Sequence, residues 1–194
     1  MNFPLQLRFK TFAIAPQISA RDASGALVLY VRQKAFKLKE VVSVFADEAR
    51  MRPLYTIAAD HVLDFSAQYH FTNTEGIRLG AVRRLGMRSL WRAHYEIVRE
   101  SDVVLRIHEE NPWMKVLDGI FGGVPVLEFF SGYLFHPAYL VTRADGAAVL
   151  RIKKQPAFLE GKYEICALAT LPEAETELAL LGVLMMILLE RSRG

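Results

Sequence analysis

The sequence contains only one cysteine, Cys166. A single cysteine cannot form an intramolecular disulfide or a cysteine cluster for a metal, so disulfide-stapled folds and cysteine-based zinc sites are excluded. One thiol is typical of a reducing compartment, where it most often serves as a small buried hydrophobic side chain. The first ten residues contain Arg8 and Lys10 and have no uninterrupted apolar segment, so they do not resemble a secretory signal. We therefore expect a cytoplasmic protein.

The chain also carries little net charge. Its 24 Lys and Arg residues against 21 Asp and Glu residues give a formal charge of +3, well below the dense basic patch of a dedicated nucleic-acid binder. With 52% hydrophobic and 23% charged residues among 194, the composition is that of a globular chain rather than a disordered one. We expect one domain spanning residues 1–194.

No apolar run is long enough for a membrane span. The longest, Leu178–Leu189, has 12 residues, and a helix of that length covers about 18 Å of a hydrocarbon core that is roughly 30 Å thick. Glutamates precede this run and arginines follow it, as the helix dipole favours. A helix that is apolar on every face must be surrounded by protein. The pattern therefore predicts a buried central helix over residues 173–191 and no transmembrane span.

Three glycines mark an internal repeat. Each follows turn-forming residues, and six positions later come an aliphatic residue and a basic or polar pair. The three units are Gly25 with Val31-Arg32-Gln33, Gly76 with Val82-Arg83-Arg84, and Gly146 with Ile152-Lys153-Lys154. Short β-rich runs on both sides of each glycine predict hairpins. A looser copy spans residues 41–57, with Arg50 in the glycine position and a return strand that begins at Pro53.

The hairpins predict a mainly β fold. Tyr95 and Ile97 alternate with His94 and Glu96, which is typical of a strand with one apolar and one polar face. The pattern gives about a dozen strands within residues 5–168. Because about eight strands form a barrel already filled by side chains, about a dozen leave room for a helix. We therefore predict an antiparallel closed barrel of about 12 strands around the C-terminal helix.

A second, shorter helix is predicted over residues 112–121. Asn111 is suited to the N-cap, Pro112 to the first helical position and Gly122 to the C-terminal stop. Its apolar stripe predicts an amphipathic helix that lies across an end or a side of the sheet.

Together these features resemble a known family. They are the hairpins with basic strand ends, Asn111-Pro112-Trp113, Ser131-Gly132-Tyr133 with His136-Pro137-Ala138-Tyr139, and the final apolar helix. The chain resembles the LURP-one-related group of the tubby-like superfamily, which includes phospholipid scramblases, and is similar to its prokaryotic members of unknown function. The resemblance implies a 12-stranded barrel around a hydrophobic helix and, from tubby domains, binding of phosphoinositides at a membrane. Because the chain lacks a calcium loop with regular oxygen-ligand spacing and a cysteine cluster for lipid anchoring, scrambling is not expected.

The candidate ligand site is basic. If the hairpins lie side by side, their basic strand ends gather on one rim, where they could bind phosphate groups of anionic phospholipids through charge-assisted hydrogen bonds. The candidate residues are Arg83, Arg84, Arg88, Arg92, Lys153 and Lys154, with Arg32, Lys34, Lys37 and Lys39 in the first copy. The alternative is that these residues are solvated strand edges that discourage edge-to-edge pairing.

Catalytic and metal chemistry find little support in the sequence. Neither Asp60-His61 with Asp64 nor His108-Glu109-Glu110 has the spacing of a known zinc site. Ser131 lacks a nucleophile elbow, and no glycine-rich phosphate loop is present. We expect neither a cofactor nor a metal, and the sequence offers no motif that supports an enzymatic activity.

Two hypotheses of function follow from the sequence. The first is a peripheral, non-enzymatic module that binds anionic lipid head groups. The second is an intracellular scaffold or small-ligand carrier, with Phe129-Phe130 and Tyr133-Leu134-Phe135 near a mouth or at an interface with another protein. Because the central helix is expected to leave little empty lumen, the outer surface and the rims are the expected places for a site.

Overall fold

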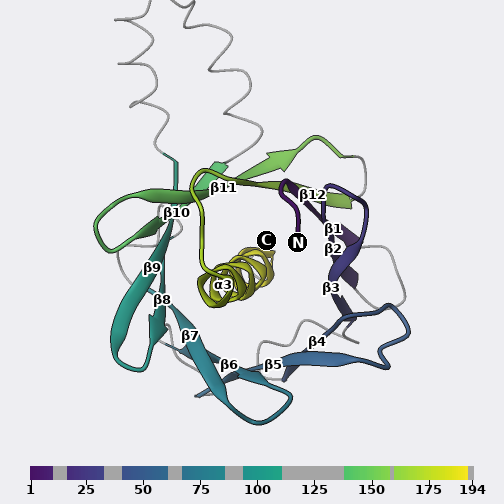
Figure 1. The fold of residues 1–194 in the computed structure, drawn as a ribbon, viewed down its shortest axis with the longest axis horizontal. Helices are drawn as coiled ribbons and strands as arrows, with labels where there is room; N and C mark the ends of the chain where they lie inside the picture. Colours follow the sequence, from purple (N-terminus) through teal and green to yellow (C-terminus); the bar gives the residue numbers. More distant parts are fainter. Residues whose placement is uncertain are drawn as a thin grey trace, which may run out of the picture.

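The computed structural model describes residues 1–10, 17–32, 41–60, 67–85, 94–110, 138–157 and 160–191. In these ranges the chain forms a closed antiparallel barrel in which each strand pairs with the next and β1 pairs with β12 (Figure 1). The strands are β1 (Leu5–Lys10), β2 (Gln17–Arg21), β3 (Leu27–Arg32), β4 (Val42–Phe45), β5 (Pro53–Ala59), β6 (Gln68–Asn73), β7 (Arg78–Arg84), β8 (His94–Arg99), β9 (Asp102–Glu109), β10 (Ala138–Arg143), β11 (Ala148–Gln155) and β12 (Glu160–Ala167). The predicted mainly β fold, a 12-stranded antiparallel barrel, is confirmed. The predicted helix at residues 112–121 and the aromatic residues at 129–135 lie outside the described residues.

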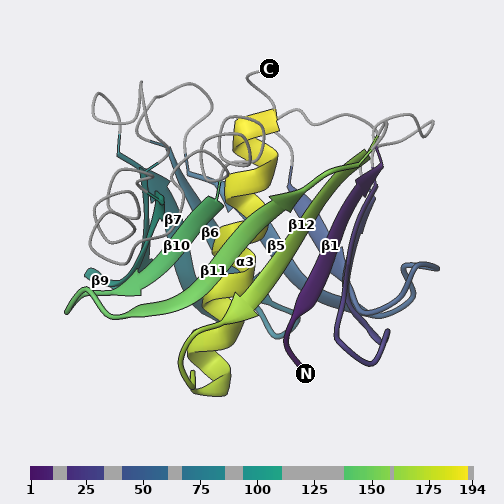
Figure 2. The ribbon, with the colours of Figure 1, turned by 90° about the horizontal axis from the view of Figure 1, so that it is seen from above.

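The helix α3 (Glu173–Arg191) runs through the barrel. Figure 2 shows that it starts at the end where the N-terminus lies and runs to the other end. Every residue from Leu178 to Leu189 is buried, against inward-facing strand residues such as Leu7 and Ile152. The predicted central helix is therefore confirmed, and it begins at the predicted residue, Glu173. In the described part of the chain, no helical segment has the length and hydropathy that a membrane span requires.

The hairpin repeat is visible in the backbone. Gly25, Gly76 and Gly146 have φ angles of +84°, +81° and +89°, and Arg50 occupies the equivalent turn position with a φ of +61°. In all four turns the amide of this residue donates to the carbonyl three residues earlier, over 2.9–3.2 Å. The hairpin with Arg50 in the glycine position is therefore confirmed. These turns share one end of the barrel, which we call the turn end.

The helix does not lie on the barrel axis but closer to β7 and β8 (Figure 1). Two glycines permit this approach. A Cβ atom on Gly182 would lie 2.4 Å from Cδ1 of Ile97 on β8, and one on Gly80 of β7 would lie 3.0 Å from Cδ2 of Leu178. Because the helix packs against this wall, more space is left on the opposite side of the lumen.

Candidate anion-binding face and end cavity

The basic strand ends predicted as a ligand site divide between two faces. Alternation along β7 and β11 places Arg83 and Lys153 on the outer surface, whereas Arg84 and Lys154 face the lumen with their register partners Tyr95 and Tyr163. Strands β7 and β11 also lie four positions apart in a barrel of twelve strands, so their ends do not adjoin. Two further candidates, Arg88 and Arg92, lie outside the described residues.

Arg83 belongs to an ion-pair network on the outer wall. Its Nε and Nη2 atoms donate to Oε2 of Glu96 on β8 over 2.9 and 2.7 Å. Nε of Arg106 on β9 approaches the other carboxylate oxygen at 3.6 Å. The Glu96 side chain is only 11% exposed, so its charge is engaged by both arginines. Arg83 is therefore partly neutralised and is a weak candidate for an external anion.

Arg84 interacts with the central helix instead of with solvent. Its side chain is 12% exposed, its Nη2 lies 3.9 Å from Oε1 of Glu190, and its guanidinium carbon lies 5.9 Å from the centre of the Tyr95 ring. Tyr95 donates its hydroxyl hydrogen to the same Glu190 oxygen. These contacts indicate that Arg84 helps to hold the end of α3 within the barrel.

Lys153 occupies the same register position in its hairpin as Arg83 does, but it makes no ion pair with the acid opposite it. It lies opposite Glu164, just as Arg83 lies opposite Glu96. Glu164 instead accepts hydrogen bonds from the side-chain amides of Gln6 at 3.1 Å and Gln155 at 3.3 Å. Within the described ranges Lys153 is exposed and makes no ion pair.

The pairing of β1 with β12 closes the barrel and brings further cations to the outer surface near Lys153. Arg8 on β1 and Lys162 on β12 are direct register partners, and both face outward because Leu7 and Tyr163 face inward. Lys10 lies two residues further along the same face of β1. We call these four cations, Arg8, Lys10, Lys153 and Lys162, the closure face. None of the four makes an ion pair in the described part of the structure.

The closure face breaks a local rule of sheet stability. Directly opposite residues on one face of an antiparallel pair have Cβ atoms about 4.5–5.5 Å apart, and like charges there are destabilising. Arg8 and Lys162 form such a pair between two strands of the barrel wall. A phosphate between them would accept hydrogen bonds from both and relieve their repulsion. The arrangement therefore suits an anionic ligand.

Local sequence reasoning missed Arg8 and Lys162 because they are separated by most of the chain. Alternation in residues 5–10 shows that Arg8 and Lys10 share the polar face of a strand. Their opposition to Lys162 depends on the register with which the first and last strands close the barrel, and this register has no local sequence signal.

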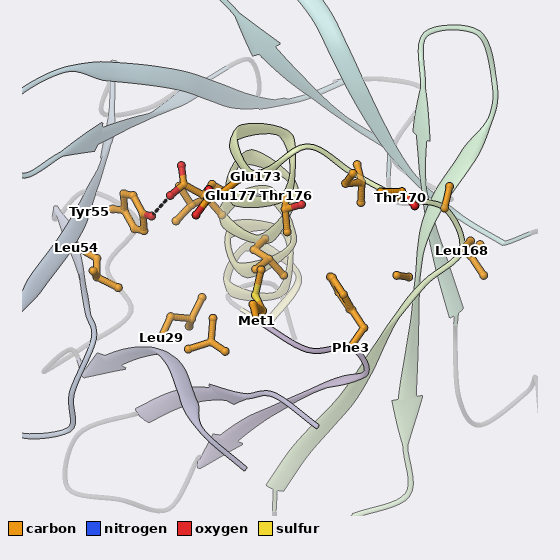
Figure 3. A pocket seen from close by; sticks show the side chains of 16 residues that line it. Met1, Phe3, Leu29, Leu54, Tyr55, Leu168, Thr170, Glu173, Thr176 and Glu177 are labelled. Atoms are coloured by element: carbon orange, nitrogen blue, oxygen red, sulfur yellow. Dashed lines mark hydrogen bonds between the residues drawn. The ribbon is translucent and has the colours of Figure 1, made fainter. Parts of the chain in front are cut away.

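A cavity of about 760 Å³ opens beside the first turns of the helix, at the turn end (Figure 3). Most of its lining residues are apolar, but polar atoms provide nearly half of its surface; the wall comes from the N-terminus, β3, β5, the segment after β12, and α3. Representative lining residues are Phe3, Leu29, Leu54, Leu171, Leu180 and Leu181. The helix was expected to leave little empty lumen, but at this end of the barrel it leaves this cavity beside it.

The two carboxylates of the cavity lie on the same side as Tyr55, and Thr170 lies on the other (Figure 3). Tyr55 on β5 donates its hydroxyl hydrogen to Oε1 of Glu177 over 2.7 Å, and Glu173 lies one turn earlier on the helix (Figure 3). Burial, together with the hydrogen bond to Glu177, raises the pKa of Tyr55 well above its usual value. Tyr55 thus remains a neutral donor at physiological pH, and the exposed Glu173 carboxylate is left without an ion pair in the described structure.

Among the described residues, no group of three His, Cys, Asp or Glu side chains is placed to hold a metal ion. His61 and Asp64 lie outside the described residues, and Nε2 of His70 lies 3.9 Å from Oδ2 of Asp60. Comparison of the chain with protein-family models, curated proteins and solved structures finds no match.

Proposed function

We propose that this protein is a non-enzymatic binding module that recognises anionic phospholipid head groups at a membrane surface through its closure face. The observation that carries the proposal is the direct opposition of Arg8 and Lys162 without an ion-pair partner for either in the described structure. The resemblance to the LURP-one-related group, itself a prediction, points in the same direction.

Electrostatics supports a surface of this kind. Each basic side chain near an anionic membrane contributes about 1 kcal/mol to binding. Four cations on adjoining strands β1, β12 and β11 therefore favour association, and they outnumber the nearby outward carboxylates of Glu160 and Glu164. Arg8 can also donate two parallel hydrogen bonds to one phosphate, which a lysine cannot do. This interaction weakens as salt screens the charges.

Sedimentation with liposomes tests the proposal. The full chain is mixed with vesicles of phosphatidylcholine alone, or of phosphatidylcholine with phosphatidylserine or a phosphoinositide, at low and at physiological salt. We expect binding only to the acidic vesicles, and weaker binding at the higher salt concentration. The double substitution Arg8→Gln/Lys162→Gln should reduce partitioning at least about tenfold, because two contributions of about 1 kcal/mol are removed.

The control removes the same net charge elsewhere. Arg78→Gln/Arg99→Gln changes two exposed arginines on β7 and β8, which lie across the barrel from β1. We expect this variant to bind acidic vesicles almost as the unsubstituted protein does. Equal losses in the two double variants would show that only net charge matters, and absence of binding at low salt would eliminate the proposed function.

A further inference from the structure

The cavity beside the first turns of α3 is a consequence of how the helix packs. Gly182 and Gly80 let the helix approach β8 and β7 closely, and the cavity lies between the helix and strands β3 and β5. Its volume of about 760 Å³ falls within the roughly 300–1,000 Å³ of small-molecule sites. The mixed polar and apolar wall favours an amphipathic ligand, whose apolar part gains from burial against the leucine side chains.

The charges of the cavity restrict the polar end of such a ligand. Glu173 and Glu177 line it, Met1 with its amino group also lines it, and no Lys, Arg or His side chain is found among its described lining residues. The hydroxyl hydrogens of Tyr55 and Thr176 are already donated, to Glu177 and to the Pro172 carbonyl. The side-chain groups left to a ligand are thus the Thr170 hydroxyl and, as the charged groups, two carboxylates. They would repel a fatty-acid carboxylate and attract a cation.

We propose that the cavity binds a small apolar molecule carrying a protonated amine, with the amine at Glu173 and Glu177 and the apolar part between α3 and β3. Tyr55 orients the Glu177 carboxylate through its hydrogen bond and leaves the second oxygen of that carboxylate available. Leu29, Leu180 and Leu181 contact the apolar part of the ligand. This site lies at the turn end, away from the closure face.

Isothermal titration calorimetry of the full chain with three probes of equal length tests the inference. The probes are decylamine, decanol and decanoate, each kept below the concentration at which it forms micelles. We expect one molecule of decylamine per chain and at least about tenfold weaker binding of decanoate, because the two carboxylates favour one charge and oppose the other. Decanol should bind with intermediate affinity.

Two variants locate the site. Leu54→Trp places a larger side chain at a half-exposed wall position and should abolish binding of decylamine. Glu173→Gln should weaken decylamine about threefold without affecting decanol, because it removes a carboxylate and no packing contact. The matched control is Glu75→Gln, in the turn between β6 and β7, which should leave all three affinities unchanged. Circular dichroism checks that each variant is folded.

Several outcomes would overturn the inference. Decanoate binding as tightly as decylamine would show that the carboxylates do not select the ligand. Decylamine binding that is unchanged in folded Leu54→Trp and in Glu173→Gln would place the ligand elsewhere, and a folded unsubstituted protein that binds none of the probes would exclude the site. Since the closure face takes no part in this experiment, these outcomes are independent of the vesicle measurements.

Discussion

Tyr95 on β8 donates its hydroxyl hydrogen to Glu190 in the last turn of α3, with an Oη–Oε1 distance of 2.5 Å. Burial, together with Glu190, raises the pKa of Tyr95 well above its usual value, so the hydroxyl stays neutral. Tyr55 makes the equivalent bond to Glu177 near the first turn of the helix. Two tyrosines from different strands therefore fix α3 near both of its ends.

We expect Tyr95→Phe to lower the free energy of unfolding by about 1.5–3 kcal/mol, the usual contribution of a hydrogen bond to a charged group. Chemical denaturation followed by circular dichroism measures the change. Tyr30→Phe is the matched control, because in the described structure the Tyr30 hydroxyl has no hydrogen-bond partner, and it should alter stability by less than about 0.5 kcal/mol. Equal effects of the two substitutions would contradict a specific role for the bond to Glu190.

A further prediction concerns the close contact between the helix and β8. Alanine at position 182 has a helix propensity better than that of glycine by about 1 kcal/mol. Its Cβ atom would nevertheless lie 2.4 Å from Cδ1 and 2.9 Å from Cγ1 of Ile97. We expect Gly182→Ala to destabilise the protein by about 1–3 kcal/mol, the usual cost of overpacking a core.

A second-site change tests this explanation. Ile97→Val removes the δ-methyl group that lies nearest, so in that background Gly182→Ala should cost less than it does alone. A double-mutant cycle measures the difference as a coupling free energy. Additive effects would show that the two residues do not compete for the same space.

The turn repeat predicts a substitution that raises the stability of the protein. Arg50 adopts a φ of +61° at the position held by glycine in three other hairpins, and the left-handed conformation costs a residue with a Cβ atom roughly 1–2 kcal/mol. Arg50→Gly should therefore raise the melting temperature, although the greater freedom of glycine in the unfolded chain reduces the gain. Gly76→Ala, the converse change in open space, should lower it. Calorimetry measures the melting temperatures of both variants. A lower melting temperature for Arg50→Gly than for the unsubstituted protein would show that the Arg50 turn is not strained.

These turns also show how much the sequence could predict. Gly25, Gly76 and Gly146 follow local rules of turn chemistry, and the apolar run of the helix follows from burial on every face, so the barrel and its helix were predictable. The opposite orientations of Arg83 and Arg84 also follow from strand alternation. Local patterns predict the hairpin neighbours but not the register with which the first and last strands close the barrel, so the opposition of Arg8 and Lys162 was not predictable. The end cavity depends on the off-axis packing at Gly182, which is a tertiary property.

Stability should also depend on pH through His108. Burial lowers the pKa of this histidine, and the His94 ring across β8 and β9 lowers it further, with centroids 6.2 Å apart, while Glu110 opposes the shift. The unfolded chain then binds a proton more readily than the folded one. The contribution of neutral His108 to the free energy of unfolding is therefore fully present above the unfolded pKa of about 6.5 and is lost as the pH falls below it.

Urea denaturation between pH 7.5 and 5.5 should therefore show falling stability, and His108→Gln should flatten the profile. Burial also lowers the pKa of His70, so part of the slope should remain in this variant. Asp22 and Asp47 have lowered pKa values and contribute only at more acidic pH. A profile with the same slope in His108→Gln would exclude His108 as a source of the pH dependence.

The last prediction concerns the helix as the core of the barrel. In α3 all residues from Leu178 to Leu189 are buried, and without them inward-facing strand residues such as Leu5, Phe71 and Ile165 would line an open lumen. Burial of a large aliphatic side chain contributes roughly 1.5–3 kcal/mol, so the sum over the helix exceeds the usual net stability of a domain, about 5–15 kcal/mol. A chain that ends at Thr170 should therefore not fold. Size-exclusion chromatography and a thermal melt of both lengths measure this, and a soluble, monomeric truncation with a cooperative melt would show that the strands close without the helix.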